Sequence, residues 1–155
     1  MQHTVPFLGT VSLVPVVRLA LVREGGASYV GEPIRSAADE AALLTPHLQD
    51  ASREVVLALL LDIRHRPVGL HVVSIGSVNS SMLPPAEVLK AALLANASAV
   101  IVAHNHPSGD AEPSPEDLTV TTRLREAGQL IGIELLDHLI VGAEGWVSLK
   151  ERGAV

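Results

Sequence analysis

The sequence is most informative at residues 99–117, which read AVIVAHNHPSGDAEPSPED. Its first five residues are apolar, and a short apolar run of this kind predicts a buried strand. A turn at 107–109 stops the run, so two histidines stand where the strand leaves the core. Functional groups of α/β proteins are commonly placed at such strand ends. We therefore expect the functional site at the end of strand 99–103.

Outside this segment the chain alternates between expected strands and helices. Further strands are predicted at 14–22, 54–62, 68–75, 133–141 and 146–149, with a hairpin joining 54–62 to 68–75. Helices are predicted at 35–48, at 84–95 and from 114 to about 128. Ser36 is the expected N-cap of the first of these helices, and Ser114 is the expected N-cap of the third. This order predicts an α/β domain with a mixed β-sheet flanked by helices.

Length and composition predict one domain over residues 1–155, with residues 1–34 as an N-terminal strand or an arm for a partner. The net charge of −6 and the 2% aromatic content leave only a weak case for a nucleic-acid partner. The chain has no cysteine and no evident signal or membrane-spanning segment, which favours a cytoplasmic protein without a membrane partner. Self-association into a homo-oligomer stays open.

The polar residues after strand 99–103 have the chemistry of a zinc site. Side chains two apart in an extended segment point the same way, so His104 and His106 can face one ion. Asp117 follows in the first turn of a predicted helix and is a candidate third ligand. Two histidines and one carboxylate leave one position for water, as in catalytic zinc sites. Either motif alone is weak, since His-x-His is common and Ser-Pro-Glu-Asp is a frequent helix start, but together they favour Zn²⁺.

A zinc hydrolase also needs a general base, and the residues alone leave four glutamates open. Glu54 has the best position, directly before an apolar and therefore central strand, although it also reads as a solvated charge. The rivals are Glu87, Glu112 and Glu116. Asp137-His138 lies inside an apolar strand, where a buried structural pair is a simpler interpretation than a partner for the zinc ligands.

The full spacing His-x-His, seven residues, Ser, two residues, Asp resembles the JAMM (MPN+) metalloprotease signature. The longer string HNHPSGD with PSPED, and LLDHLIVG at 135–142, resemble the RadC family in particular. The likeness covers roughly residues 36–150, and we place the RadC-like JAMM core at 35–150. We expect the chain to lack the N-terminal helix-hairpin-helix type domain of longer RadC proteins, for which it has no room. It also lacks the long insertions by which JAMM deubiquitinases recognise ubiquitin.

The resemblance implies a cytidine-deaminase-like JAMM/MPN fold with zinc held by His104, His106 and Asp117. It also implies that Glu54 is the acid/base and that Ser114 helps to stabilise the oxyanion. The expected function is a zinc metallopeptidase or isopeptidase acting on a peptide or protein. Two alternatives are a DNA-repair-associated protein acting on or near nucleic acid, and a zinc-stabilised interaction module.

Overall fold

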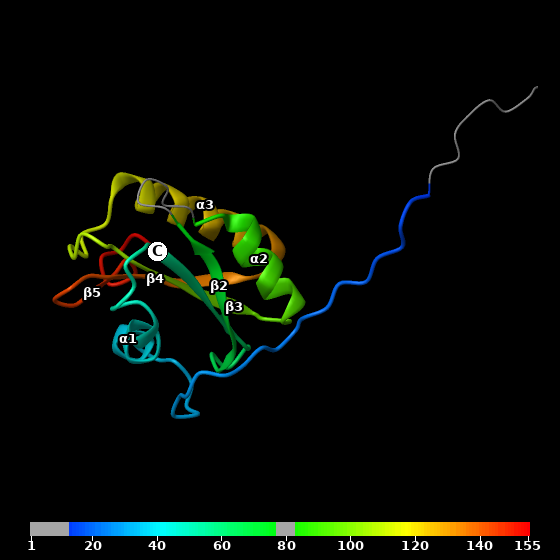
Figure 1. Ribbon diagram of the computed structural model, residues 1–155, viewed down its shortest axis with the longest axis horizontal. Helices are drawn as coiled ribbons and strands as arrows, with labels where there is room; N and C mark the ends of the chain where they lie inside the picture. Colours follow the sequence, from blue (N-terminus) through cyan, green and yellow to red (C-terminus); the bar gives the residue numbers. More distant parts are fainter. Residues whose placement is uncertain (1–12, 77–82) are drawn as a thin grey trace, which may run out of the picture.

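The computed structural model describes residues 13–76 and 83–155 and contains one five-stranded sheet. The strands are β1 (Val55–Leu61), β2 (Pro67–Ile75), β3 (Ala99–Asn105), β4 (Glu134–Val141) and β5 (Trp146–Ser148). Their order is β2-β1-β3-β4-β5, and β3 and β4 run parallel while the other neighbours are antiparallel (Figure 1). The predicted mixed sheet and the predicted hairpin of β1 and β2 are confirmed.

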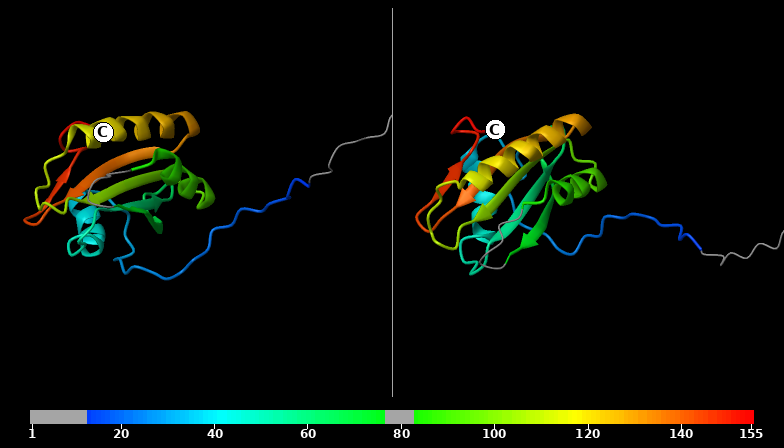
Figure 2. Two further views of the ribbon diagram at one scale, coloured as in Figure 1. Left: turned by 45° about the horizontal axis from the view of Figure 1, so that its top comes forward. Right: turned by 90° about the horizontal axis from the view of Figure 1, so that it is seen from above.

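Helices cover both faces of this sheet. α1 (Ala37–Leu44), followed by the 3₁₀ turn η1 (Thr45–His47), lies on one face, and α2 (Pro85–Leu94) and α3 (Pro115–Ile131) lie on the other (Figure 2). Each face has its own apolar core, because alternate side chains of a strand point to opposite sides. β1 and β3 are buried on both faces, which makes them the central strands and places the end of β3 inside the molecule.

A one-residue bulge in β4 determines which side chains reach the α3 face. Val100 of β3 pairs with Leu135, but the next residue, Ile101, pairs with Asp137, so Leu136 is left over. Leu135 packs in the α2–α3 core, and without the bulge Asp137 would point to that same side. The extra residue reverses the alternation, so His138 reaches the α3 face and Asp137 reaches the α1 face.

Two predicted elements differ from the structure. Residues 14–22 form no strand: residues 13–30 have no secondary structure, and their large apolar side chains are exposed. A strand needs a neighbour for its backbone hydrogen bonds, and no other part of the described chain lies beside this segment (Figure 1). Whether residues 1–34 serve as an arm for a partner stays a prediction.

The second difference is the end of α3, which continues past Gly128 to Ile131 and is capped by Gly132 in the left-handed conformation. Gly128 has a packing role instead, because a Cβ there would lie 2.3 Å from the carbonyl oxygen of Ile133. Ser80-Ser81, which precede the helix predicted at 84–95 and fit a loop that could border the site, fall outside the described residues. None of the helices in residues 13–76 and 83–155 is long and apolar enough to cross a membrane.

Candidate metal centre

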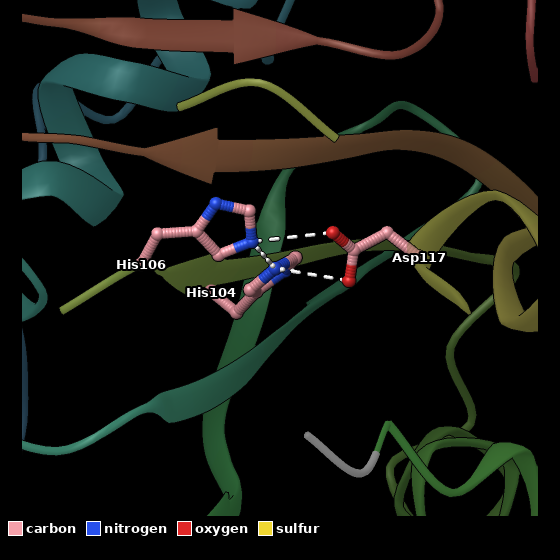
Figure 3. Close-up of side chains that lie close together, drawn as sticks. All are labelled: His104, His106 and Asp117. Atoms are coloured by element: carbon pink, nitrogen blue, oxygen red, sulfur yellow. Dashed lines mark hydrogen bonds and ion pairs between the residues drawn. The ribbon is translucent and has the colours of Figure 1, made fainter. Parts of the chain in front are cut away.

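The structure brings His104, His106 and Asp117 together at the end of β3 (Figure 3). Nε2 of His104 lies 3.0 Å from Nε2 of His106. The two carboxylate oxygens of Asp117 lie 3.3 Å and 3.2 Å from these same nitrogens. His104 and Asp117 are buried, and His106 is half-buried. The three side chains that the sequence singled out therefore converge from β3, the loop after it and the first turn of α3.

Local capping directs Asp117 toward the strand end. Ser114 is the N-cap of α3: its hydroxyl accepts from the Asp117 backbone N–H at 3.1 Å, and Asp117 Oδ2 accepts from the Ser114 N–H at 2.8 Å. This capping box fixes the carboxylate in the first turn of the helix. The predicted N-cap is confirmed, and it is also what orients the carboxylate of the candidate site.

The three donors lie close enough together to share one metal ion. Zinc bonds of about 2.0–2.2 Å place neighbouring ligand atoms about 3.3 Å apart in a tetrahedral site. The two imidazole nitrogens are 3.0 Å apart, and each faces a different oxygen of Asp117, at 3.3 Å for His104 and 3.2 Å for His106. The donor set of two imidazoles and one carboxylate suits zinc and also admits other divalent ions. These residues can therefore hold a metal ion.

Hydrogen bonds away from the centre determine the tautomer of each imidazole. His106 Nδ1 lies 2.7 Å from the Asp110 carbonyl, which only accepts, so Nδ1 carries the proton and Nε2 keeps its lone pair. A series of three hydrogen bonds fixes the tautomer of His104. The Thr121 hydroxyl donates to the Asp117 carbonyl, accepts from His138 Nδ1, and leaves His138 Nε2 to accept from His104 Nδ1. Both ligating nitrogens are thus left unprotonated, as metal binding requires.

The electrostatics of the site call for a cation among these donors. When no metal ion is bound, protons between these groups take its place: burial alone would raise the pKa of Asp117, but the hydrogen bonds that His104 and His106 then donate outweigh it and hold that pKa well below its usual range. The hydrogen bond to Asp117 raises the pKa of His106. Burial lowers the pKa of His138 to about 3, so this imidazole stays neutral. A carboxylate and two lone pairs facing one another repel unless a proton or a metal ion lies between them.

Known proteins match the same part of the chain. The family model described as "RadC-like JAB domain" matches residues 34–154. The chain is 50% identical over 121 residues to a UPF0758 protein of Chloroflexus aggregans, which covers 78% of this chain and 53% of the relative. It is 46% identical over 131 residues to one of Methanosarcina acetivorans, covering 83% and 57%, and 48% identical over 120 residues to one of Shouchella clausii, covering 77% and 52%. This chain belongs to the RadC family.

The chain spans about half the length of the curated relatives that it matches. The relatives' name, UPF0758 protein, states no reaction. The α/β fold with its mixed sheet agrees with the JAB/MPN-like fold of the RadC family.

Glu54 lies beside the candidate metal ligands. The antiparallel pairing of β1 with β3 ends at Val56 and His104, two residues after Glu54, and the charge of Glu54 contributes to raising the pKa of His106. Glu54 is half-buried and lines one cavity together with His104 and Asp117. The rivals differ in their surroundings: Glu87 pairs with Lys90, and Glu112 pairs with Arg152, both at 2.7 Å. Glu116 is exposed at the same cavity.

Asn105, between the two histidines, holds the segment that carries Glu54. Its side-chain oxygen accepts from the Val55 N–H at 2.7 Å, and its amide donates to the carbonyls of Arg53 and Ala51 at 2.9 Å and 3.3 Å. Neighbouring side chains of a strand point to opposite sides, so Asn105 points away from the two histidines. The connection to Glu54 spans about fifty residues of sequence, so no local pattern could reveal it.

His138 and Thr121 are the residues of the site that the sequence did not assign. The structure shows that His138 contacts a candidate ligand, contrary to the preferred interpretation of Asp137-His138 as a structural pair. Asp137 does have a structural role, since it accepts from the N–H groups of His138 and Lys150 and from the hydroxyl of Ser148. The spacing of Thr121 four residues after Asp117 was the available signal, because it places both on one face of a helix.

Proposed function

We propose that this RadC-family chain is a zinc-dependent hydrolase of the JAMM type that cleaves amide bonds in peptides or proteins. The observation that carries the proposal is the convergence of His104, His106 and Asp117, of which His104 and Asp117 line the same cavity as Glu54. A site of three protein ligands that opens on a cavity has the form of a catalytic rather than a structural zinc centre. The lack of cysteine is in keeping with action in the cytoplasm.

In this proposal the residues divide the work of amide hydrolysis. Zinc held by His104, His106 and Asp117 supplies Lewis acidity and makes water more acidic. Glu54 takes the proton of the attacking water and returns it to the leaving amine. The Ser114 hydroxyl accepts from the Asp117 N–H, which leaves its own O–H free to donate to the oxyanion that develops on the substrate carbonyl. Capping and oxyanion stabilisation thus use different parts of one hydroxyl.

The test combines metal analysis with a peptide-library digestion of the full chain. We expect about one zinc per chain, strong loss of zinc in Asp117→Ala, and cleavage that chelation abolishes. Glu54→Gln should keep its zinc while turnover falls about 10²–10⁴-fold, the usual contribution of a general base. Glu87→Gln is the matched control, because this glutamate lies on α2 and pairs with Lys90.

Two outcomes would replace the proposal. Zinc binding with no turnover that depends on Glu54 would indicate a zinc-stabilised interaction module. Zinc-dependent cleavage of oligonucleotides, with a DNA affinity that falls steeply with salt, would indicate an enzyme of nucleic acids.

A further inference from the structure

The candidate metal centre opens on a cavity of about 450 Å³. Its walls come from the start of β1, the start of α2 and the first turns of α3. This size lies within the range of small-molecule and short-peptide sites, about 300–1,000 Å³. The cavity therefore has room for substrate groups on at least one side of the reacting bond.

Charge is distributed unevenly around this cavity. Its carboxylates, Glu54, Glu116 and Asp117, lie at the end that holds the metal residues. Arg123 lines the cavity two turns further along α3, about 9 Å from Asp117 along the helix axis at about 1.5 Å per residue. The Arg123 guanidinium has no hydrogen bond or ion pair with any residue in 13–76 and 83–155, whereas Arg152 pairs with Glu112.

Most of the remaining wall is apolar. Val56, Leu83, Pro84, Pro85 and Val120 line the cavity. Such a wall accepts an apolar side chain and offers no competing charge to an ion at the Arg123 end. An extended peptide rises about 3.3 Å per residue, so about 9 Å corresponds to two or three residues.

We propose that Arg123 selects the substrate: the cavity takes a peptide with a carboxylate two or three residues from the scissile bond, and Arg123 pairs with that carboxylate. The inference rests on the proposed amidase function and adds a substrate class to it. Glu116, in the first turn of α3, repels a carboxylate placed next to the reacting bond, so the charges also set the register of the peptide. A nucleic-acid ligand fits less well, because its repeated phosphates would face three carboxylates and one arginine.

The experiment uses the zinc-loaded full chain and three libraries of internally quenched peptides. The libraries are identical except at one fixed position, which carries Glu, Gln or Lys and is moved from one to four residues on either side of a randomised core. We expect kcat/KM to be about tenfold higher for Glu than for Gln at the position two or three residues from the cleaved bond, because a charge-assisted pair is lost with Gln. The difference should appear in KM, since this contact is remote from the reacting bond.

Substitutions in α3 test whether the preference for Glu depends on the Arg123 side chain. Arg123→Ala should lower the Glu library to the level of the Gln library, and Arg123→Glu should favour Lys instead. Arg125→Ala is the matched control: it removes a neighbouring arginine of the same helix that does not line the cavity, and it should leave the Glu preference unchanged. Arg123 is exposed, so these changes should leave zinc content and thermal midpoint as they are.

The outcomes separate this inference from the function on which it rests. Cleavage without a Glu preference, or a preference that survives in Arg123→Ala, overturns the role of Arg123 and leaves the amidase proposal standing. No cleavage of any library by zinc-loaded protein overturns both. Binding of a single-stranded oligonucleotide that is lost in Arg123→Ala, with no peptide preference, would assign this arginine to phosphate instead.

Discussion

At the scale of single residues, the candidate centre is organised by hydrogen bonds that lie behind the three ligands. His104 depends on His138, and His138 depends in turn on Thr121, whose hydroxyl both accepts from the imidazole and donates to the Asp117 carbonyl. This series of hydrogen bonds connects the side chain of His104 to the backbone carbonyl of Asp117. A change in any link therefore alters the tautomer or the orientation of the His104 ring.

The first prediction concerns Thr121. In Thr121→Val the shape is nearly kept, but His138 loses the acceptor for its Nδ1–H, so the bond that orients His104 weakens. We expect the zinc dissociation constant to rise about 10–100-fold, as is usual for partners of ligating histidines. Competition with a chromophoric chelator measures it. Thr122→Val is the control, because that hydroxyl donates only to the Leu118 carbonyl. Equal affinities for the two variants would contradict the prediction.

Asn105 carries the second prediction. Asn105→Asp keeps an oxygen for the Val55 N–H but removes the amide that donates to Arg53 and Ala51, so the segment holding Glu54 loosens. If Glu54 is the base, turnover should fall about tenfold or more, since misplacing a catalytic group is costly, while zinc content stays near one per chain. Steady-state kinetics beside elemental analysis would reveal this split. A parallel fall in zinc content would instead place Asn105 among the supports of the ligands.

At the scale of elements, the two ends of α3 have different roles. Its N-terminus presents Asp117 from a capping box, and its C-terminal turns must pack closely on the chain that enters β4. Asp117, Thr121, Leu124 and Gly128 are its buried residues, three or four apart, so they form one stripe along the helix. The small residue at the end of this stripe allows the helix to approach the chain before β4, and β4 carries His138.

The third prediction tests this close approach. In an exposed helix Gly→Ala stabilises, but in Gly128→Ala the new Cβ would lie 2.3 Å from the Ile133 carbonyl oxygen, so the helix or β4 must shift. We expect a loss of about 1–3 kcal/mol in the free energy of unfolding, as for other overpacked sites, measured by urea denaturation. Gly132→Ala, at φ +79° with open space around it, should cost only about 1 kcal/mol. The reverse ranking would show that the helix and the chain before β4 can move apart to admit the new methyl group.

At the scale of the whole molecule, the two faces of the sheet differ in their polar content. The α3 face holds the candidate metal centre, whereas the α1 face holds a pair of carboxyl groups, Glu40 of α1 and Asp137 of β4. Oε2 of Glu40 has no hydrogen-bond partner among the described residues, and two carboxyl groups can hydrogen-bond only when one of them is protonated. Burial first, and then Asp137, raise the pKa of Glu40 to about 8; Glu151 acts in the same direction and Lys150 opposes it.

The fourth prediction is a pH dependence of stability that comes from Glu40. Between its ordinary pKa of 4.5 and about 8, the folded protein holds a proton that the unfolded chain releases. This contribution is complete below pH 4.5 and is lost as the pH rises through 8, at a slope of at most about 1.4 kcal/mol per pH unit. The free energy of unfolding of Glu40→Gln, measured by urea denaturation, should therefore rise relative to that of the wild type between pH 5 and pH 8.5. A constant difference between the two proteins would show that Glu40 does not titrate.

The fifth prediction concerns the segment before α1. Residues 13–30 have no secondary structure and expose their large apolar side chains, and the hydrogen bond from Ile34 to the His65 carbonyl ties the chain to the domain just before α1. The family match also begins at residue 34. Removing residues 1–32 should therefore leave the thermal midpoint within a few degrees and zinc binding unchanged, as scanning calorimetry and metal analysis would show. A large drop in the midpoint would mean that this segment packs on the domain.

Local patterns were sufficient for much of this molecule. The burial of β1 and β3, the hairpin, the serine caps of α1 and α3 and the three candidate ligands all depend on residues close together in the chain, where spacing and side-chain direction are linked. Strand 14–22 failed because apolar periodicity cannot supply a neighbouring strand. The end of α3 was misplaced because a glycine can serve close packing as well as capping.

The surroundings of the three ligands depend on contacts between distant segments. His138 faces His104 only because the bulge at Leu136 reverses the alternation of β4, and a shift of one residue is invisible in an apolar run. Glu54 lies at the cavity of the candidate ligands only because β1 and β3 pair in one particular register. The sequence alone was therefore enough to identify the three candidate ligands, because they lie close together in the chain. The residues that orient and surround these ligands depend on strand register, which is set by contacts between segments tens of residues apart.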